Sequence, residues 1–315
     1  MSKRAYLMFS VIVLASIVLA ACGGGAPAGG TVKVVSDLPM TGSSLGQTQT
    51  IVNGITQAFE EKNNTICGGA WQIQYEAHDD ASAALGKWDP DVVTANAKAY
   101  AADPSIVAVI GTFNSGAAQL MIPILNPENL VMVSPANTYP GLTKPGKGEA
   151  DEPGKYFPGG TPNYTRVVPA DDLQGAVAAQ WAQQLGASSV YILDDQELYG
   201  KGVADVFDKV AQEIGLTVLG HEGIDGKAAD YKALATKVKD LDPGLIYFGG
   251  ITQNNAGQLW KDIRNVGYEG ILMGPDGLAE AAFIDAAGDA AEGTYLTFGG
   301  VPASELQGAA ATWRE

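Results

Sequence analysis

From Thr31 onward, short runs rich in β-branched residues alternate with longer, alanine-rich amphipathic stretches, roughly every 25 residues. Because parallel strands need a crossover connection that is usually a helix, this alternation predicts an α/β protein with parallel sheets. The first series of predicted elements comprises strands at Thr31–Leu38, Trp71–Ala77, Ile106–Gly111 and Leu130–Ser134, and helices at Gln47–Glu61, Val92–Ala101 and Ser115–Leu125.

A second series follows a long irregular stretch. Residues 135–162 contain six glycines and six prolines, and a loop of this length is usually functional or marks a boundary. The second series comprises strands at Ser189–Leu193, Thr217–Glu222, Leu245–Gly249 and Gly270–Met273, and helices at Leu173–Leu185, Gly202–Ile214, Tyr231–Leu241 and Gln253–Val266. A body of about 290 residues exceeds what one hydrophobic core usually takes, so we expect two doubly wound parallel-sheet lobes, with residues 166–169 crossing between them.

The first residues predict a secretory signal. Lys3 and Arg4 precede an apolar run that ends in small residues before Cys22. The run is shorter than the ~20 residues that cross a bilayer comfortably, so a retained transmembrane helix is the weaker interpretation. Residues 19–22, Leu-Ala-Ala-Cys, resemble the lipobox of bacterial lipoproteins, which implies that Cys22 is the lipid-modified N-terminus. We expect a signal peptide at 1–21 and a flexible glycine-rich tether at 22–30.

Charge and cysteine usage exclude several classes of partner. Removing residues 1–21 takes away two of the 19 basic residues and no acidic one, so the net charge falls from −16 to −18. Such an acidic chain is not expected to bind nucleic acid, or membrane other than through a lipid anchor. Two histidines and two cysteines make a zinc cluster improbable. With Cys22 lipidated, we expect Cys67 to be a buried small hydrophobe.

Polar residues follow several predicted strands, where ligands of doubly wound sheets collect. Gly111–Gly116 ends a strand and opens a helix, which would turn backbone N–H groups and hydroxyls toward an anion. Ser134–Thr138 offers another hydroxyl and amide after the next strand, and Asp276 ends a strand of the second series, where a carboxylate suits an ammonium group. N-caps and ordinary turns are the structural alternatives for these residues.

Two segments resemble enzyme motifs. Gly42–Gly46 fits a nucleophile elbow around Ser44, with His221 as the base of a hydrolase, but no earlier loop would supply an oxyanion hole. Gly200–Asp205 resembles the start of a dinucleotide fingerprint, but Asp205 stands where a third glycine or alanine belongs, so a helix start with close backbone packing is favoured. We therefore expect no enzymatic activity and no cofactor.

Eight segments, in chain order, carry a family resemblance. They are Leu38–Gly42, Asp79–Ser82, Val109–Gly111 with Ser115, Val133–Thr138, Arg166–Pro169 with Gln174–Gly175, Asp194–Asp195 with Tyr199–Gly202, Tyr247–Gly250 and Gly274–Gly277. Together they resemble the type I periplasmic solute-binding proteins of the branched-chain amino acid class, which are extracytoplasmic receptors of ABC importers. The resemblance implies a ligand pocket between two lobes and a membrane permease as partner.

The resemblance also implies roles for individual residues. Ser115 and Thr138 would bind the α-carboxylate of the ligand with hydroxyls and nearby amides. Ala136 would offer its carbonyl oxygen to the ammonium group, and Asp276 would supply the counter-charge in place of the glutamate common in amino-acid binders. The ligand implied is a small amino acid or a related amide or zwitterion.

The remaining implied ligand-binding residues shape the pocket. Tyr199 would close over the ligand from the second lobe, Leu45 would line the side-chain subsite, and Ile251 stands where amino-acid binders often have a tyrosine. Family members usually continue beyond this chain's last residue, so we expect a C-terminally truncated first lobe at 31–167 plus 298–315, and a second lobe at 168–297. A lipid-anchored ligand sensor of the same fold is the alternative function.

Overall fold

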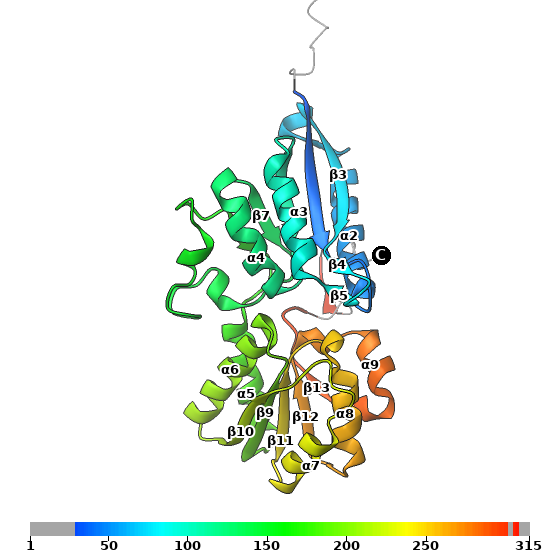
Figure 1. The fold of residues 1–315 in the computed structure, drawn as a ribbon, viewed down its shortest axis with the longest axis vertical. Helices are drawn as coiled ribbons and strands as arrows, with labels where there is room; N and C mark the ends of the chain where they lie inside the picture. The colour runs from blue at the N-terminus through cyan, green and yellow to red at the C-terminus, as the bar shows by residue number, and fades with distance from the viewer. Residues whose placement is uncertain (1–28, 302–304, 309–315) are drawn as a thin grey trace, which may run out of the picture.

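The computed structural model describes residues 29–301 and 305–308, so the predicted signal peptide, Cys22 and most of the predicted tether lie outside the described residues. Figure 1 shows two α/β units along the long axis of the molecule. The unit built around the six-stranded sheet β2-β3-β1-β6-β7-β8 is called the first lobe below, and the unit around the five-stranded sheet β10-β9-β11-β12-β13 is called the second lobe. No helix of the described ranges is long and apolar enough to span a bilayer.

The first lobe follows the predicted order of strands and helices. Its elements are β1 (Thr31–Leu38), α2 (Leu45–Glu60), β2 (Thr65–Ile66), β3 (Trp71–Asp79), β4 (Ala81–Ser82), β5 (Lys87–Trp88), α3 (Pro90–Ala102), β6 (Ile106–Gly111), α4 (Ser115–Leu125), β7 (Val131–Ser134) and β8 (Tyr164–Arg166). Strand β1 pairs in parallel with β3 and β6. The short strands β2, β4 and β5 pair antiparallel and were not predicted.

The second lobe is a continuous βα alternation. Its elements are α5 (Asp171–Gln184), β9 (Ser189–Asp194), α6 (Leu198–Glu213), β10 (Thr217–Gly223), α7 (Lys232–Asp240), β11 (Leu245–Gly249), α8 (Ala256–Asn265), β12 (Ile271–Gly274), the 3₁₀ turn η6 (Asp276–Leu278), α9 (Ala281–Ala287) and β13 (Tyr295–Leu296). The helix predicted from Gln253 starts at Ala256, because Asn255 has a φ of 68° and the residues before it form a 3₁₀ turn. Helix α9 and strand β13 were not predicted.

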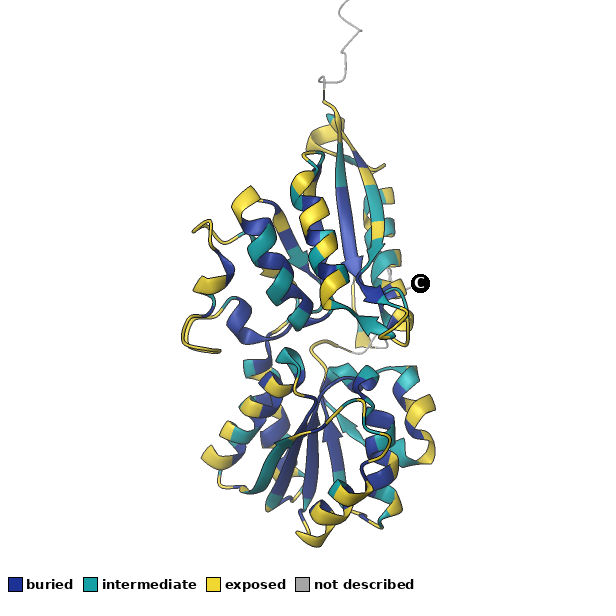
Figure 2. Ribbon diagram, in the orientation of Figure 1, coloured by how far each residue is buried: buried dark blue, intermediate teal, exposed yellow. Residues whose placement is uncertain are grey.

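Both faces of the second-lobe sheet are buried, as expected for parallel strands covered by helices (Figure 2). Along β9, Tyr191 and Leu193 pack into one hydrophobic cluster with Trp260, whereas Val190 and Ile192 pack into the cluster on the opposite face. Successive side chains of a strand point to opposite faces. The uninterrupted apolar runs of β9 and β11 therefore supply two cores at once.

The structure corrects the prediction for Cys67, whose side chain is exposed rather than buried. Cys67, Gly68 and Gly69 all have positive φ values in the tight turn that joins β2 to β3. A residue at such a hairpin tip has no hydrophobic layer to enter. Cys67 has no disulfide partner among the described residues.

One histidine in the second lobe links three elements through charge. Nδ1 of His221 on β10 lies 2.9 Å from Oδ2 of Asp208 on α6, and Nε2 lies 3.2 Å from Oδ2 of Asp194 at the end of β9. Burial of the imidazole disfavours its protonation, but the two carboxylates outweigh burial and raise the pKa of His221 above its usual value.

We expect His221→Gln to destabilise the protein in acidic but not in alkaline solution. Because the folded-state pKa of His221 is raised, its stabilisation is fully present below the unfolded pKa and is lost as pH rises through the folded pKa. Urea unfolding of both proteins at about pH 5.5 and about pH 9 measures the difference. An equal loss of unfolding free energy at both pH values would contradict the prediction.

Candidate functional site

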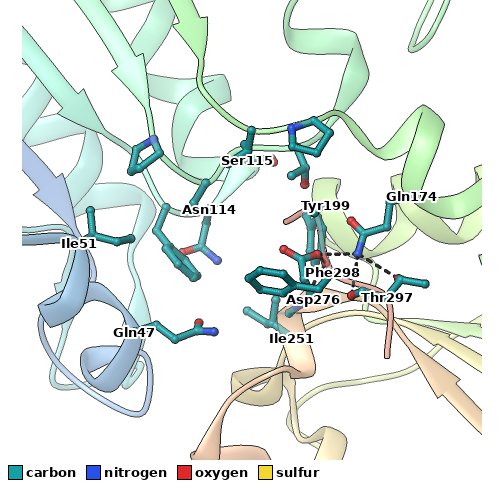
Figure 3. Close-up of a pocket in the computed structure, with 18 of the residues that line it drawn as sticks. Gln47, Ile51, Asn114, Ser115, Gln174, Tyr199, Ile251, Asp276, Thr297 and Phe298 are labelled. Carbon is teal, nitrogen blue, oxygen red and sulfur yellow. Dashed lines mark hydrogen bonds between the residues drawn. The ribbon is translucent and has the colours of Figure 1, made fainter. Parts of the chain in front are cut away.

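A cavity of about 400 Å³ lies between the carboxyl ends of the strands of the two lobes (Figure 3). Its wall comes from α2, from the loops after β6 and β7, from the crossing at 168–169, from α5 and α6, and from the loops after β11, β12 and β13. Among the residues that the structure describes, none of those lining the cavity is lysine, arginine or histidine, and Asp276 is the one acidic residue. The described part of the wall therefore holds one formal negative charge and no formal positive charge.

The first-lobe wall of the cavity is built to donate hydrogen bonds. Helix α4 starts at Ser115, which lines the cavity, and the first N–H groups of a helix have no partner within it. Oγ1 of Thr138 is buried and has no hydrogen-bond partner among the described residues, so its hydroxyl can donate to a ligand. A helix N-terminus beside a free hydroxyl favours an anionic group of a ligand. Oδ1 of Asn114, which is also buried without a described partner, is an acceptor and suits a donor group instead.

Local packing explains why the chain presents these groups here. Strand β6 ends at Gly111, where a Cβ would lie 2.5 Å from the carbonyl oxygen of Asp37. The turn after β7 is shaped by Ser134, whose Oγ accepts from the N–H groups of Ala136 and Asn137 at 3.1 and 2.7 Å. The same turn brings Ala136 and Thr138 into the cavity wall beside Ser115.

The second-lobe wall is built to accept hydrogen bonds around Asp276, the first residue of η6. Oδ1 of Asp276 accepts from the hydroxyl of Tyr199 at 2.6 Å and from Nε2 of Gln174 at 2.8 Å (Figure 3). Burial raises the pKa of Asp276, although these two hydrogen bonds oppose the shift. Asp276 thus has no cationic partner among the described residues, and its side chain faces the cavity, where a ligand cation could lie.

A second carboxyl group reinforces this negative site. Asp171, the first residue of α5, is fully buried, and neither of its side-chain oxygens has a hydrogen-bond partner among the described residues. Burial, and next the charge of Asp276, raise the pKa of Asp171 well above its usual value, while the nearby hydroxyl of Thr138 and then Arg166 offset part of the shift. A ligand cation placed beside Asp276 would lower the electrostatic cost of both carboxylates.

Six of the seven predicted ligand-binding residues line the cavity. They are Ser115, Ala136, Thr138, Tyr199, Ile251 and Asp276. The structure does not bring Leu45 into the wall: it begins α2 and is 41% exposed. The same helix instead lines the cavity with Gln47, Thr50 and Ile51, because only one face of α2 points inward.

Sequence reasoning missed the apolar part of the wall. Phe113 and Ile51 face the cavity from the first lobe, Leu173 and Val177 line it from α5, and Phe298 lines it from the segment after β13. Leu173 and Val177 are separated by one helical turn of α5 and are both exposed, a pattern that marks an unpaired apolar stripe. That spacing was the signal available in the sequence.

The structure does not bring the two residues of the hydrolase interpretation together. Ser44 is buried at the N-cap of α2 in the first lobe, whereas His221 lies on an edge strand of the second lobe between two carboxylates. The glycine motif is a helix start with close packing, as predicted. A Cβ on Gly200 would lie 2.6 Å from the carbonyl oxygen of Gly249.

Comparisons with known proteins agree with this architecture. Residues 31–314 match the sequence model of a protein family that is described as "Periplasmic binding protein". The Leu/Ile/Val-binding protein homolog 1 of Brucella suis is 29% identical over 296 residues, which cover 94% of this chain and 73% of the relative. The leucine-, isoleucine-, valine-, threonine-, and alanine-binding protein of Pseudomonas aeruginosa is 27% identical over 288 residues, which cover 90% of this chain and 71% of the relative.

Solved structures share the fold. The leucine binding protein LivK of Thermotoga maritima superimposes with a TM-score of 0.76 at 25% identity, over 90% of this chain and 74% of the other. A second solved structure is the branched-chain amino acid transporter substrate binding protein LivJ of Streptococcus pneumoniae in complex with isoleucine. It gives a TM-score of 0.73 at 21% identity, over 90% of this chain and 75% of the other. The α/β fold of this chain is therefore shared with solved binding proteins.

Proposed function

Because the chain belongs to the periplasmic binding protein family, we propose that it is the substrate-binding lipoprotein of an ABC transporter and binds a small amino acid between its lobes. Cys22 would hold the protein at the outer face of the cell membrane through its lipid. The closed, ligand-loaded form would be presented to the permease. We propose lobe boundaries of 31–167 plus 298–315 and 168–297.

One observation carries this proposal, namely the opposite character of the two cavity walls. The α4 N-terminus and Thr138 offer hydrogen-bond donors to a carboxylate, and Asp276 offers an anionic acceptor to an ammonium group. A zwitterion satisfies both walls at once, whereas a simple carboxylate or amine satisfies one. Since the walls belong to different lobes, binding and closure are coupled, as in hinge-type domain closure.

The apolar wall supports an aliphatic side chain on the ligand. Ile51, Phe113, Leu173 and Val177 present hydrocarbon to the cavity, and burying apolar surface stabilises binding by about 25 cal/mol per Å². The relatives named for leucine, isoleucine and valine fit this chemistry. We therefore take L-leucine as the reference ligand.

A ligand sensor anchored by the same lipid is the second candidate. It would use the same cavity but would pass the closed form to a signalling partner. The genes beside this one distinguish the two functions, because adjacent permease and ATPase genes favour transport.

Thr138→Val tests the carboxylate site. The hydroxyl of Thr138 is buried near the carboxyl group of Asp171 without a well-formed hydrogen bond, so we expect the thermal stability of the ligand-free protein to change little. Affinity for L-leucine should fall about tenfold, because one hydrogen bond to a charged group is worth about 1.5 kcal/mol. Calorimetric titration and thermal unfolding measure the two effects, with Thr217→Val, at an exposed position of β10, as the matched control. Unchanged affinity in Thr138→Val would contradict this assignment.

A further inference from the structure

The β4–β5 hairpin reaches from the first lobe toward the second (Figure 1). The hairpin is held at its base by Asp79, whose Oδ1 accepts from the N–H groups of Ala81 and Met40 at 2.8 Å each. Its tip packs against the loop before α2, where a Cβ on Gly42 would lie 1.9 Å from the carbonyl oxygen of Gly86. The hairpin is therefore a fixed part of the first lobe.

Two side chains of this hairpin bind one carboxylate of the second lobe. Nζ of Lys87 donates to Oε1 of Glu197 at 2.5 Å and to Oδ1 of Asn254 at 2.6 Å. Nε1 of Trp88 donates to Oε2 of Glu197 at 3.0 Å, so both carboxylate oxygens are taken. The side chains of Lys87 and Glu197 are only 21% and 22% exposed, so solvent screens this pair less than a surface pair.

On the second lobe, hydrogen bonds connect Glu197 and Asn254 to the cavity wall. The buried carboxylate of Asp195 accepts from Nδ2 of Asn254 at 2.7 Å and from the N–H groups of Glu197 at 3.0 Å and Ile251 at 3.2 Å. Ile251 lines the cavity, as does Tyr199, two residues after Glu197. Movement of Glu197 is thereby coupled to the second-lobe wall.

On the first lobe, the same hairpin touches the donor wall. The Trp88 ring lies against Gly116, where a Cβ would lie 2.8 Å from the ring. Gly116 is the second residue of α4 and follows Ser115. Neither Lys87, Trp88, Glu197 nor Asn254 lines the cavity itself.

We propose an interlobe latch that holds the cavity closed without touching the ligand, an inference that rests on the proposed function. The latch consists of Lys87, Trp88, Glu197 and Asn254. The latch residues lie on different lobes, so their contacts exist only when the lobes are together. The latch shifts the equilibrium toward the closed form both with and without ligand. Because apparent affinity scales with the closed fraction, losing the latch weakens binding through closure alone.

Lys87→Met and Glu197→Gln test the latch with L-leucine as the probe. Each should weaken binding about tenfold, within the usual range of coupling between sites, mainly through faster dissociation. Lys87→Arg should restore much of the affinity, and the double variant should be no worse than either single variant, because both break the same contact. Lys201→Met is the matched control, since its ion pair with Asp205 lies within one lobe and is exposed. Unchanged affinity in Lys87→Met and Glu197→Gln would overturn the proposal.

Small-angle X-ray scattering separates failure of the latch from failure of the proposed function. Without ligand, Lys87→Met and Glu197→Gln should have a larger radius of gyration than the wild-type and Lys201→Met proteins, with equal thermal stability. If neither the wild-type protein nor any variant binds L-leucine, the proposed function is contradicted, but the radius of gyration still shows whether the latch holds the lobes together. Wild-type scattering from both latch variants would overturn it.

Discussion

Asp276→Asn is expected to weaken binding of L-leucine at least about 30-fold. The carboxylate of Asp276 faces the cavity with no described cation in the wall, so a ligand ammonium group would be its counter-charge. Removing one partner of a desolvated charge pair costs about 2–5 kcal/mol, and about 1.4 kcal/mol is tenfold in affinity. Asparagine keeps the size of the side chain and an oxygen that accepts from Tyr199 and Gln174.

The choice of ligand and of pH makes this prediction specific. Affinity for 4-methylpentanoate, which lacks the ammonium group, should rise or stay equal in Asp276→Asn, because an unpaired negative charge is removed from the wall. Since burial raises the pKa of Asp276, wild-type affinity for L-leucine should fall with decreasing pH earlier than an ordinary aspartate would dictate. Asp285→Asn, at an exposed position of α9, is the control. Equal losses for L-leucine and 4-methylpentanoate would contradict an ammonium site.

Trp260→Ala is expected to lower the free energy of unfolding of the second lobe by about 3–5 kcal/mol, the usual cost of truncating a buried tryptophan. Trp260 on α8 is completely buried. Its ring makes edge contacts with Phe248 and Phe283 at centroid distances of 5.8 and 5.3 Å. Nε1 donates to Oγ1 of Thr294 at 2.9 Å, so truncation also leaves that hydroxyl without its donor.

Urea unfolding followed by circular dichroism measures this loss. Trp71→Ala is the matched control, because Trp71 on β3 is 40% exposed and its removal opens no internal cavity. A similar, small effect of both substitutions would show that the cluster around Trp260 does not organise the second-lobe core.

The long strands and helices could be predicted because a strand buried on both faces of its sheet has a recognisable hydrophobic pattern in the sequence. Strands such as β9 and β11 are continuous apolar runs. Ser115 follows the end of β6 in the first lobe and Asp276 follows the end of β12 in the second lobe, so each lies at the carboxyl edge of its own sheet and both line the cavity between the lobes. The hairpin strands β4 and β5 have two residues each, which is too short for any period to be read. Their position depends on Asp79 and on packing against Gly42.

The wrong predictions, and the contact that was not predicted, depend on the three-dimensional arrangement of the elements. The family resemblance implied that Leu45 lines the pocket, but the rotation of α2 turns Gln47 and Ile51 inward instead. Cys67 was judged from its usual preference for burial, but it lies in a turn. Residues 110 positions apart form the Lys87–Glu197 contact, and such a contact depends on how two lobes approach each other, which local sequence patterns do not record.

Calorimetric titration of the wild-type protein with L-leucine, 4-methylpentanoate and 3-methylbutylamine tests the central claim most directly. The three molecules share a branched hydrocarbon, but the second lacks the ammonium group and the third lacks the carboxylate. If opposite walls of one cavity recognise the two charges, L-leucine binds at least about 30-fold more tightly than either analogue. Equal affinity for L-leucine and either analogue, or no binding of L-leucine by the folded protein, would contradict the account.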